Sequence, residues 1–220
     1  GQLRAVQYRD IVILSRSVAT WGNTVAAVLK DCDIPAHVES NTGYFSSYEI
    51  QVILSMLRIL DNPLQDIPMA AVLASPIVGM DDEELAQIRS AFKGVSFAQA
   101  ALSAMAGENG YEDEKLKAFA LVFERLRGAV ADTPIHELLY MMLDETGFYR
   151  YASAMPAGKR RRQNIDMLIE MAAAYEKTSY KGLFHFVRYI DIQQKYEIDY
   201  GEADTAGEND DVVRIMTIHK

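Results

Sequence analysis

Positive charge gathers in four consecutive basic residues, Lys159-Arg160-Arg161-Arg162, which could meet phosphates. They follow Pro156-Ala157-Gly158, a turn-forming run, so we expect the cluster in a loop or at the start of a helix. Positive groups held together there could contact nucleic-acid phosphates. A solvated helix face is the simpler interpretation of the same side chains. Both interpretations stay open from these residues alone.

Three common signatures of catalytic and cofactor-binding sites are absent from the sequence. No Gly-x-x-x-x-Gly-Lys-Ser/Thr run occurs, so the chain has no P-loop to hold a nucleotide. A Gly-x-Ser-x-Gly run is missing as well, which excludes the simplest hydrolase. The histidines are far apart and form no zinc-type cluster with cysteine; they are His37, His136, His185 and His219. The chain is therefore expected to bind no metal and no cofactor by itself.

The charge balance limits the surface that a nucleic acid could cover. With 22 basic and 31 acidic side chains the net charge is −9, which argues against a protein coated by nucleic acid but leaves room for a local patch. The acids concentrate in residues 81–84 and 197–211. The single cysteine, Cys32, excludes an intrachain disulfide, fits a reducing cytoplasm, and is expected to be buried near a helix end. No apolar stretch approaches membrane-spanning length.

Strand-like runs occur near both ends of the chain. Ile11–Leu14 is continuously apolar, as in a parallel strand covered on both faces, and residues 36–39 read as a second strand. The residues between them predict a helix capped by Asn23 and ended before Pro35, which together make a βαβ unit. Residues 212–220 read as the last strand. No loop or cap follows that strand, so we expect an excised piece of a larger enzyme.

The long middle of the chain predicts helices only. Ser46 and Glu49 have capping-box spacing before an apolar helical stripe that ends near Pro63. Thr133 is expected to cap a later helix that closes at Gly147. A connection of more than 150 residues between strands is too long for a crossover, so it is best interpreted as an inserted domain. The predicted fold class is α/β with a large all-α insertion: a partial parallel sheet plus a mostly helical domain.

The two end strands carry a resemblance to a known family. The run Asp10-Ile11-Val12-Ile13-Leu14-Ser15-Arg16-Ser17 is similar to motif IV of the UvrD-type superfamily 1 helicases. Residues 43–50, followed by Leu57-Arg58, resemble the segment just downstream in that family. Ile215-Met216-Thr217-Ile218-His219-Lys220 is similar to the start of motif V. Order and spacing agree along the whole chain.

The resemblance implies a RecA-like second motor domain, 2A, formed by residues 1–62 and 209–220, with a helical 2B domain inserted at 63–208. In the family the motif IV arginine, Arg16 here, reaches the γ-phosphate of ATP held by the other motor domain, so Arg16 is the expected catalytic residue. Thr217 and His219 match motif V residues that contact single-stranded DNA. ATP and Mg²⁺ are therefore expected in the full-length protein, whereas the fragment alone is expected to bind neither.

Three further segments resemble the helicase–nuclease branch of the family, which works in the AddAB complex of double-strand-break repair. They are residues 75–80, 181–186 and 208–216. This branch implies an ATP-dependent 3′ to 5′ DNA helicase with an exonuclease, acting in recombination in the cytoplasm. The implied partners are single-stranded and duplex DNA and an AddB-type nuclease subunit, with no membrane. The fragment itself is expected to be inactive.

The chain departs from the family's Pro-x-x-Gly-x-Gly turn at residues 76–81, where Asp81 replaces the second glycine. Three more acids follow, so we expect this loop to cap a helix rather than to bind DNA. Lys159–Arg162 is then the better candidate for contact with duplex DNA.

Three other functions fit parts of the same sequence. A UvrD-, PcrA- or Rep-like helicase without a nuclease partner would carry the same motifs, and residues beyond Lys220 would separate it from the helicase–nuclease branch. A non-catalytic helical module on an α/β stub would bind protein and never touch nucleotide. A duplex-binding module would show salt-dependent DNA binding by residues 63–208 alone.

Overall fold

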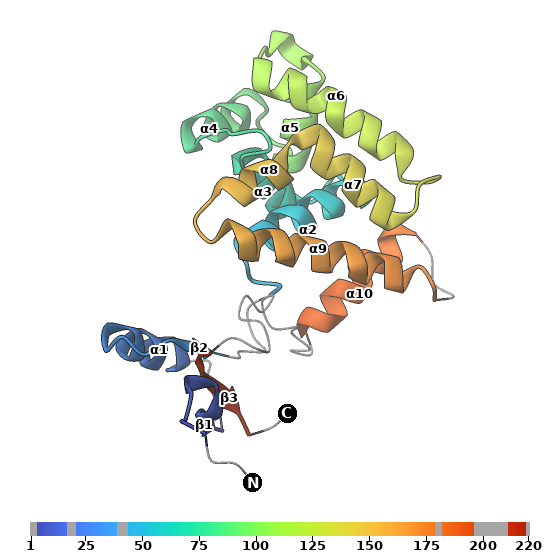
Figure 1. Cartoon of the computed structure of the whole chain (residues 1–220). Helices are drawn as coiled ribbons and strands as arrows, with labels where there is room; N and C mark the ends of the chain where they lie inside the picture. The colour runs from blue at the N-terminus through green and yellow to red at the C-terminus, as the bar shows by residue number, and fades with distance from the viewer. Residues whose placement is uncertain (1–3, 17–20, 39–43, 179–181, 196–210, 219–220) are drawn as a thin grey trace. The chain divides into compact units, whose positions relative to one another are not determined.

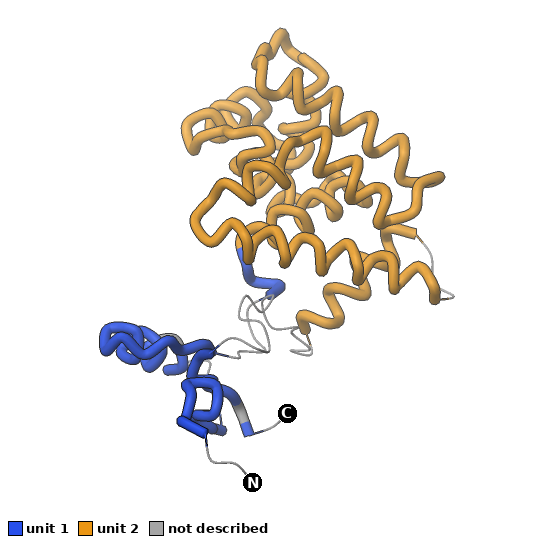
Figure 2. The backbone as a smooth tube through the Cα atoms, in the orientation of Figure 1, with its two compact units in different colours: residues 1–47, 197–220 blue, residues 48–196 orange. Residues whose placement is uncertain are grey.

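A computed structural model describes residues 4–16, 21–38, 44–178, 182–195 and 211–218 of the protein. Contacts between Cα atoms divide the chain into two compact units, coloured separately in Figure 2. The first, which we call the sheet unit, consists of residues 1–47 and 197–220. The second, the helical unit, consists of residues 48–196. The division falls before the first long helix of the middle region, whereas the sequence placed the boundary after it.

The sheet unit carries all three strands of the described residues (Figure 1). Its elements are a 3₁₀ turn η1 (Tyr8–Asp10), β1 (Val12–Ser15), α1 (Gly22–Asp31), β2 (Ala36–Val38) and β3 (Val213–Thr217). The strands are parallel in the order β1-β3-β2, so the last strand lies between the first two. The predicted pairing of the two ends of the chain in one parallel sheet is confirmed.

The central strand is the best covered part of this sheet. Val213 and Ile215 of β3 are buried, and α1 packs against β2. The edge strand β1 differs from the sequence prediction of a strand covered on both faces, because Val12 is 45% and Leu14 58% exposed. Its apolar run therefore reflects strand propensity more than burial within the described residues.

The helical unit is built around one buried helix. Its elements in chain order are α2 (Tyr48–Asp61), α3 (Asp66–Ala74), α4 (Asp82–Ala91), α5 (Phe97–Met105), η2 (Glu108–Gly110), α6 (Glu114–Ala129), α7 (Ile135–Thr146), α8 (Phe148–Ala154), α9 (Gly158–Tyr175) and α10 (Leu183–Lys195). Helix α2 contacts α3, α6, α9 and α10 and lies among them in Figure 1. A helix that is apolar around most of its circumference is stable only when it is enclosed. The described residues of this unit contain no strand, as predicted.

Helix ends agree with the sequence where a cap is local. Asp81 caps α4 by accepting from the Glu84 amide at 2.8 Å, and the Glu84 carboxylate accepts from the Asp81 amide at 2.8 Å. Gly147 ends α7 in the left-handed conformation, with φ 66°. The prediction that the acidic loop caps a helix is therefore confirmed.

Other predicted caps are displaced. Helix α1 begins at Gly22, which leaves Asn23 inside its first turn. Helix α7 begins at Ile135, one residue later than a Thr133 cap requires, and the carboxylate of Glu176 accepts from the Ile135 amide instead. A distant side chain thus satisfies the exposed amide, which sequence spacing cannot show. Cys32 is exposed, so its predicted burial is wrong. Within the described residues no helix is both long and apolar enough to span a bilayer.

Candidate functional site

The carboxyl edge of the sheet brings two of the predicted site residues together. In the parallel pairing of β1 with β3, Ser15 lies opposite Thr217, and the Ile218 amide donates to the Ser15 carbonyl at 2.9 Å. Arg16 follows Ser15 directly and is exposed. Neighbouring strands are about 4.8 Å apart, so the backbones at Arg16 and Thr217 share one edge although 200 residues separate them in sequence. His219 lies outside the described residues.

This edge has the general geometry of a ligand site in an α/β sheet. Parallel strands end together at their carboxyl ends, where the loops that follow can surround a ligand. Among the described residues, no hydrogen bond or ion pair engages the Arg16 guanidinium. An exposed guanidinium in that position can form two parallel hydrogen bonds to a phosphate.

Exposed polar contacts surround the opposite end of the sheet, where β1 and β3 begin. Arg4 donates from Nη1 and Nη2 to the two carboxylate oxygens of Asp10 at 2.7 and 2.6 Å. The hydrogen bonds from Arg4 and from the Gln7 amide lower the pKa of Asp10 to about 2. The Arg9 amide donates to Asp211 Oδ1 at 3.0 Å, which ties the start of β3 to η1. The bond between Arg9 and Asp211 helps to hold β1 and β3 in register, and hence Arg16 beside Thr217.

The basic cluster forms the first turns of α9, which begins at Gly158 as its turn-forming prelude predicted. Lys159 and Arg162 are exposed, whereas Arg160 and Arg161 are half-buried. Arg160 makes interactions within the fold. The four residues therefore present two outward cations, and the other two side chains turn partly into the protein.

Arg161 is held by a buried carboxylate. Its Nη1 donates to Glu49 Oε2 at 2.5 Å and its Nε to the Pro156 carbonyl at 3.1 Å. Asn164 donates from Nδ2 to Glu49 Oε1 at 2.6 Å, and the side chain of Glu49 is only 2% exposed. Glu49, Arg161 and Asn164 thus form one polar cluster that joins the start of α2 to the start of α9.

The interpretation of Glu49 as a capping residue is wrong. Helix α2 begins at Tyr48, so Glu49 is one position too early to close a box with a cap at Ser47, and both of its oxygens are bonded to α9. Asn164 was not singled out from the sequence. The available signal was spacing: Asn164 follows Arg161 by three residues, which places both on one face of the helix.

The start of α9 depends on a close approach of backbone. A β-carbon added to Gly158 would overlap the carbonyl of Ser153, near the end of α8. Ala157, the residue before the helix, has the left-handed conformation with φ 59°. The chain therefore turns sharply from α8 into α9, and only a glycine at position 158 allows this approach.

Metal-binding groups are not gathered in the described residues, where no cluster of three His, Cys, Asp or Glu side chains occurs. His136 instead pairs with Glu176 through Nδ1 and Oε2 at 2.5 Å. Of the basic residues singled out from the sequence, Arg16 in the sheet unit and Lys159 and Arg162 of α9 in the helical unit are exposed and able to meet a phosphate.

Comparisons with known proteins place this geometry in a family. The model of the UvrD-like helicase C-terminal domain matches residues 2–220. A protein of Oceanobacillus iheyensis, named as a subunit of an ATP-dependent helicase/nuclease, is 41% identical over 222 residues, covering 100% of this chain and 18% of that protein. Proteins of the same name from Bacillus cytotoxicus and Anoxybacillus flavithermus are 43% and 42% identical over 100% and 99% of the chain, and again 18% of each relative is covered.

The chain thus spans about a fifth of the length of these curated relatives. The match extends over both units, so the pairing of the terminal strands and the helical unit between them belong to one family pattern. The chain belongs to the family of UvrD-like helicase C-terminal domains.

Proposed function

We propose that this chain is part of an ATP-dependent 3′ to 5′ DNA helicase and exonuclease that acts in the repair of double-strand breaks by recombination. The names of the relatives, which join helicase and nuclease, support this proposal. They also favour it over a UvrD-, PcrA- or Rep-like helicase without a nuclease partner. The chain by itself has no P-loop and is proposed to be inactive.

The sheet unit is proposed to belong to a RecA-like motor domain, 2A, and most of the helical unit to an inserted domain, 2B. The return of the chain after the helical unit into the centre of the sheet supports this division. The functional boundaries proposed from the sequence are 1–62, 63–208 and 209–220. Helix α2 would then link the two domains, although most of its contacts are with the helical unit.

Arg16 is proposed to act on ATP bound by the other motor domain. ATP with Mg²⁺ would supply the phosphoryl group that is transferred to water. The role of Arg16 would be to place a guanidinium against the γ-phosphate oxygens, where negative charge must be stabilised in the transition state. Arginines in this role contribute roughly 10³ to 10⁵ in rate. Their planar donors suit phosphate better than the single ammonium of lysine.

Thr217 and His219 are proposed to contact single-stranded DNA. A threonine hydroxyl can hydrogen-bond a phosphate, and an imidazole can hydrogen-bond or stack on a base. The pairing of β1 with β3 supports a shared role, because a shift of the edge that carries Arg16 would also carry Thr217. This link would couple the state of the nucleotide to movement along the strand.

The first turns of α9 are proposed to contact duplex DNA. Lys159 and Arg162 would meet phosphates directly, since both side chains are exposed. Arg160 and Arg161 would contribute positive charge and hold the turn in place, given the bond of Arg161 to Glu49. The full protein is further proposed to work in the cytoplasm with an AddB-type nuclease subunit.

One observation carries the motor proposal: Arg16 and Thr217 lie on the same edge of one parallel sheet, in a chain that matches helicases over its whole length. The test is Arg16→Ala in the full-length protein. We expect ATP turnover to fall by about 10³-fold while the affinity for single-stranded DNA stays nearly constant. Arg127→Ala, an exposed arginine at the end of α6, is the matched control. Unchanged turnover in Arg16→Ala would remove this residue from the mechanism.

A further inference from the structure

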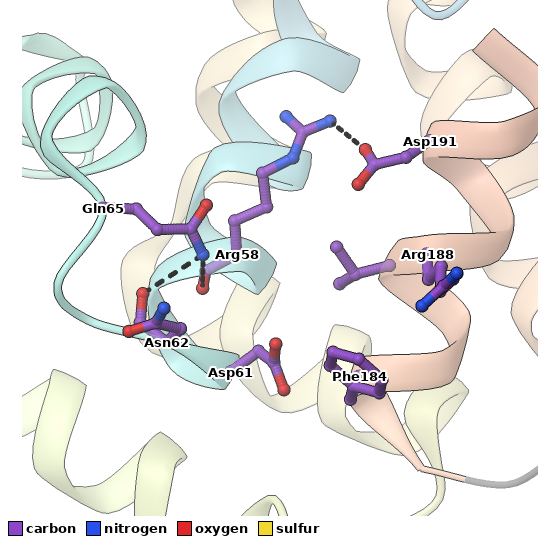
Figure 3. Close-up of a pocket in the computed structure, with 8 residues that line it drawn as sticks. Arg58, Asp61, Asn62, Gln65, Phe184, Arg188 and Asp191 are labelled. Carbon is purple, nitrogen blue, oxygen red and sulfur yellow. Dashed lines mark hydrogen bonds and ion pairs between the residues drawn. The ribbon is translucent and has the colours of Figure 1, made fainter. Parts of the chain in front are cut away.

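A pocket of about 620 Å³ lies in the helical unit, between the C-terminal half of α2 and the first half of α10 (Figure 3). This volume falls in the range of small-ligand sites, about 300–1,000 Å³. Six of the eight lining residues are polar or charged, although apolar atoms supply much of the lining surface; the eight are Arg58, Asp61, Asn62, Gln65, Phe184, Val187, Arg188 and Asp191. None of the sequence motifs discussed above gives this pocket a function.

One side of the pocket is already held by internal bonds. Arg58 pairs with Asp191 at 2.7 Å and thereby joins α2 to α10. Gln65 donates from Nε2 to the carbonyls of Arg58 and Asn62 at 3.1 and 3.3 Å, across the turn that ends α2 (Figure 3). These bonds connect α2 with α10 and order one side of the pocket.

Three other lining residues, Asp61, Arg188 and Phe184, are open to a ligand, although the Phe184 ring has an edge contact with the His185 ring at 5.3 Å between centroids. Among the described residues no hydrogen bond or ion pair engages the Asp61 carboxylate or the Arg188 guanidinium. Phe184 is 53% exposed, an unusual position for a phenyl ring. Figure 3 shows Asp61 and Phe184 near each other at the lower part of the pocket. Burial raises the pKa of Asp61, because its charged form has lost water without gaining a hydrogen-bond donor.

The combination excludes the simplest ligand classes. A bare anion would meet two carboxylates, Asp61 and Asp191, as well as the two arginines. A metal ion would find a single uncommitted carboxylate beside a guanidinium. A purely apolar ligand would leave the charged groups without water or partners. A flat ring with hydrogen-bond donors on its edge and a phosphate nearby satisfies all three open groups.

We propose that this pocket binds an unpaired nucleobase of single-stranded DNA. Phe184 stacks on the base, Asp61 accepts a hydrogen bond from an amino group on its edge, and Arg188 contacts the neighbouring phosphate. Stacking on an aromatic side chain is sequence-tolerant and strong in single-strand binding. The inference rests on the proposed function as a DNA helicase, and adds a base contact in the helical unit to the phosphate contacts proposed for the sheet edge.

The chemistry of Asp61 predicts a preference among bases. Cytosine and adenine present an amino group that can donate to a carboxylate, whereas thymine presents a carbonyl in the same position. A carbonyl oxygen that faces a carboxylate oxygen is repelled by it. We therefore expect about fivefold tighter binding of short oligo(dC) than of oligo(dT) through this pocket, the lower end of what one good edge contact gives.

The test uses the full-length protein in complex with its partner. An oligonucleotide of thymines with one central 5-iodocytosine is irradiated on the complex, and the cross-linked residue is located by mass spectrometry. We expect a cross-link at Phe184.

Three variants test the contacts one by one. Phe184→Ala is expected to weaken oligonucleotide binding about fivefold or more. Arg188→Ala is expected to weaken the binding of oligo(dC) and oligo(dT) equally, and Asp61→Asn is expected to remove the preference for oligo(dC). Asp61→Asn preserves size, so it remains informative if Phe184→Ala unfolds.

Tyr140→Ala and Arg150→Ala are the matched controls, an exposed aromatic residue on α7 and an exposed arginine on α8. Cross-links elsewhere together with unchanged affinities in all three pocket variants would overturn the proposal. Loss of the partner protein from the complex with unchanged DNA binding would also overturn it, in favour of a protein-docking site. Normal DNA-stimulated ATP turnover by the wild-type protein in either case would show that only the pocket, and not the motor function, had failed.

Discussion

An edge strand of the sheet unit and the central helix of the helical unit differ in how far they are enclosed, and so does one ion pair from each unit. In the sheet unit the edge strand exposes Val12 and Leu14, and the Arg4 and Asp10 side chains of its bidentate ion pair are 62% and 30% exposed. In the helical unit α2 is buried around most of its surface, and the side chains of Glu49 and Arg161 are 2% and 20% exposed. The helical unit therefore encloses its own core, whereas β1 is not covered by the described residues.

This difference changes what an ion pair does for stability. Water and salt screen an exposed pair, which typically contributes little. A buried pair also adds little net stability, because the loss of water offsets the attraction of the charges. Removal of one partner is costly, however, since the remaining charge then has neither water nor a counter-charge. The free energy of unfolding should thus be sensitive to single changes in the cluster of Glu49, Arg161 and Asn164 and insensitive to the loss of the exposed Arg4–Asp10 pair.

Replacement of Glu49 by glutamine should produce the largest loss. Glu49→Gln leaves the Arg161 guanidinium without its carboxylate, and breaking a buried pair costs about 3–5 kcal/mol. Because Arg161 keeps some contact with solvent, we expect the lower end of that range. Helical circular dichroism followed through urea unfolding of the 220-residue chain would measure the change.

An exposed pair in the same unit is the control for this variant. Glu114 pairs with Lys117 at 3.2 Å, and the two side chains are 91% and 47% exposed. Glu114→Gln should change the free energy of unfolding by less than about 0.5 kcal/mol. Equal effects of the two substitutions would mean that enclosure of Glu49 has no energetic consequence, and the contrast between enclosed and exposed ion pairs would lose its basis.

The turn into α9 offers a second test of close packing in the helical unit. Gly158→Ala forces a methyl group against the Ser153 carbonyl, and such overpacking costs about 1–3 kcal/mol. Gly128→Ala is the matched change in α6, where an added β-carbon meets no atom within 4 Å. There alanine should stabilise the helix by about 0.5–1 kcal/mol. Opposite signs in urea unfolding would confirm the close approach, and equal signs would refute it.

The sequence predicted the type and ends of helices and strands better than their burial and their contacts. Chain-breaking residues placed the end of α2 near Pro63 and the end of α7 at Gly147, close to where the structure has them. These signals are local, since an apolar stripe or a chain-breaking residue acts within a turn or two. The parallel pairing of β1 with β3 followed from the two motif-bearing ends.

What the sequence could not show were partners distant in the chain. Glu49 has the spacing of a cap but bonds Arg161 and Asn164, more than 110 residues away. Similarly, α7 is capped by Glu176 rather than by Thr133. The exposure of β1 was missed because an apolar run has the same pattern in a covered strand and at an open edge. The pocket beside Phe184 could not be predicted either, because α2 and α10, which line it, are far apart in the sequence.

Relief of backbone strain at Ala157 should give a smaller effect than the preceding changes. A left-handed conformation costs a non-glycine residue about 1–2 kcal/mol, and glycine loses about 0.5–1 kcal/mol in chain entropy. Ala157→Gly should therefore raise the free energy of unfolding by about 0.5 kcal/mol. Ala106→Gly, an exposed alanine with ordinary φ of −77° after α5, should lower it. A loss in both variants would show that position 157 is not strained.

Loss of the exposed Arg4–Asp10 pair should change the pKa of Asp10 measurably but should hardly change the free energy of unfolding. The folded pKa of Asp10 is about 2, below the ordinary 3.8, so its stabilising contribution is complete above about pH 4 and is lost as the pH falls through 2. Arg4→Ala should move the midpoint, followed by carboxyl-carbon NMR, part of the way back toward 3.8, because the Gln7 amide still donates to Asp10. A midpoint that stays near 2 would assign the shift to the backbone rather than to Arg4. The backbone of the η1 turn would then account for the low pKa of Asp10, and the ion pair with Arg4 would not be needed for it.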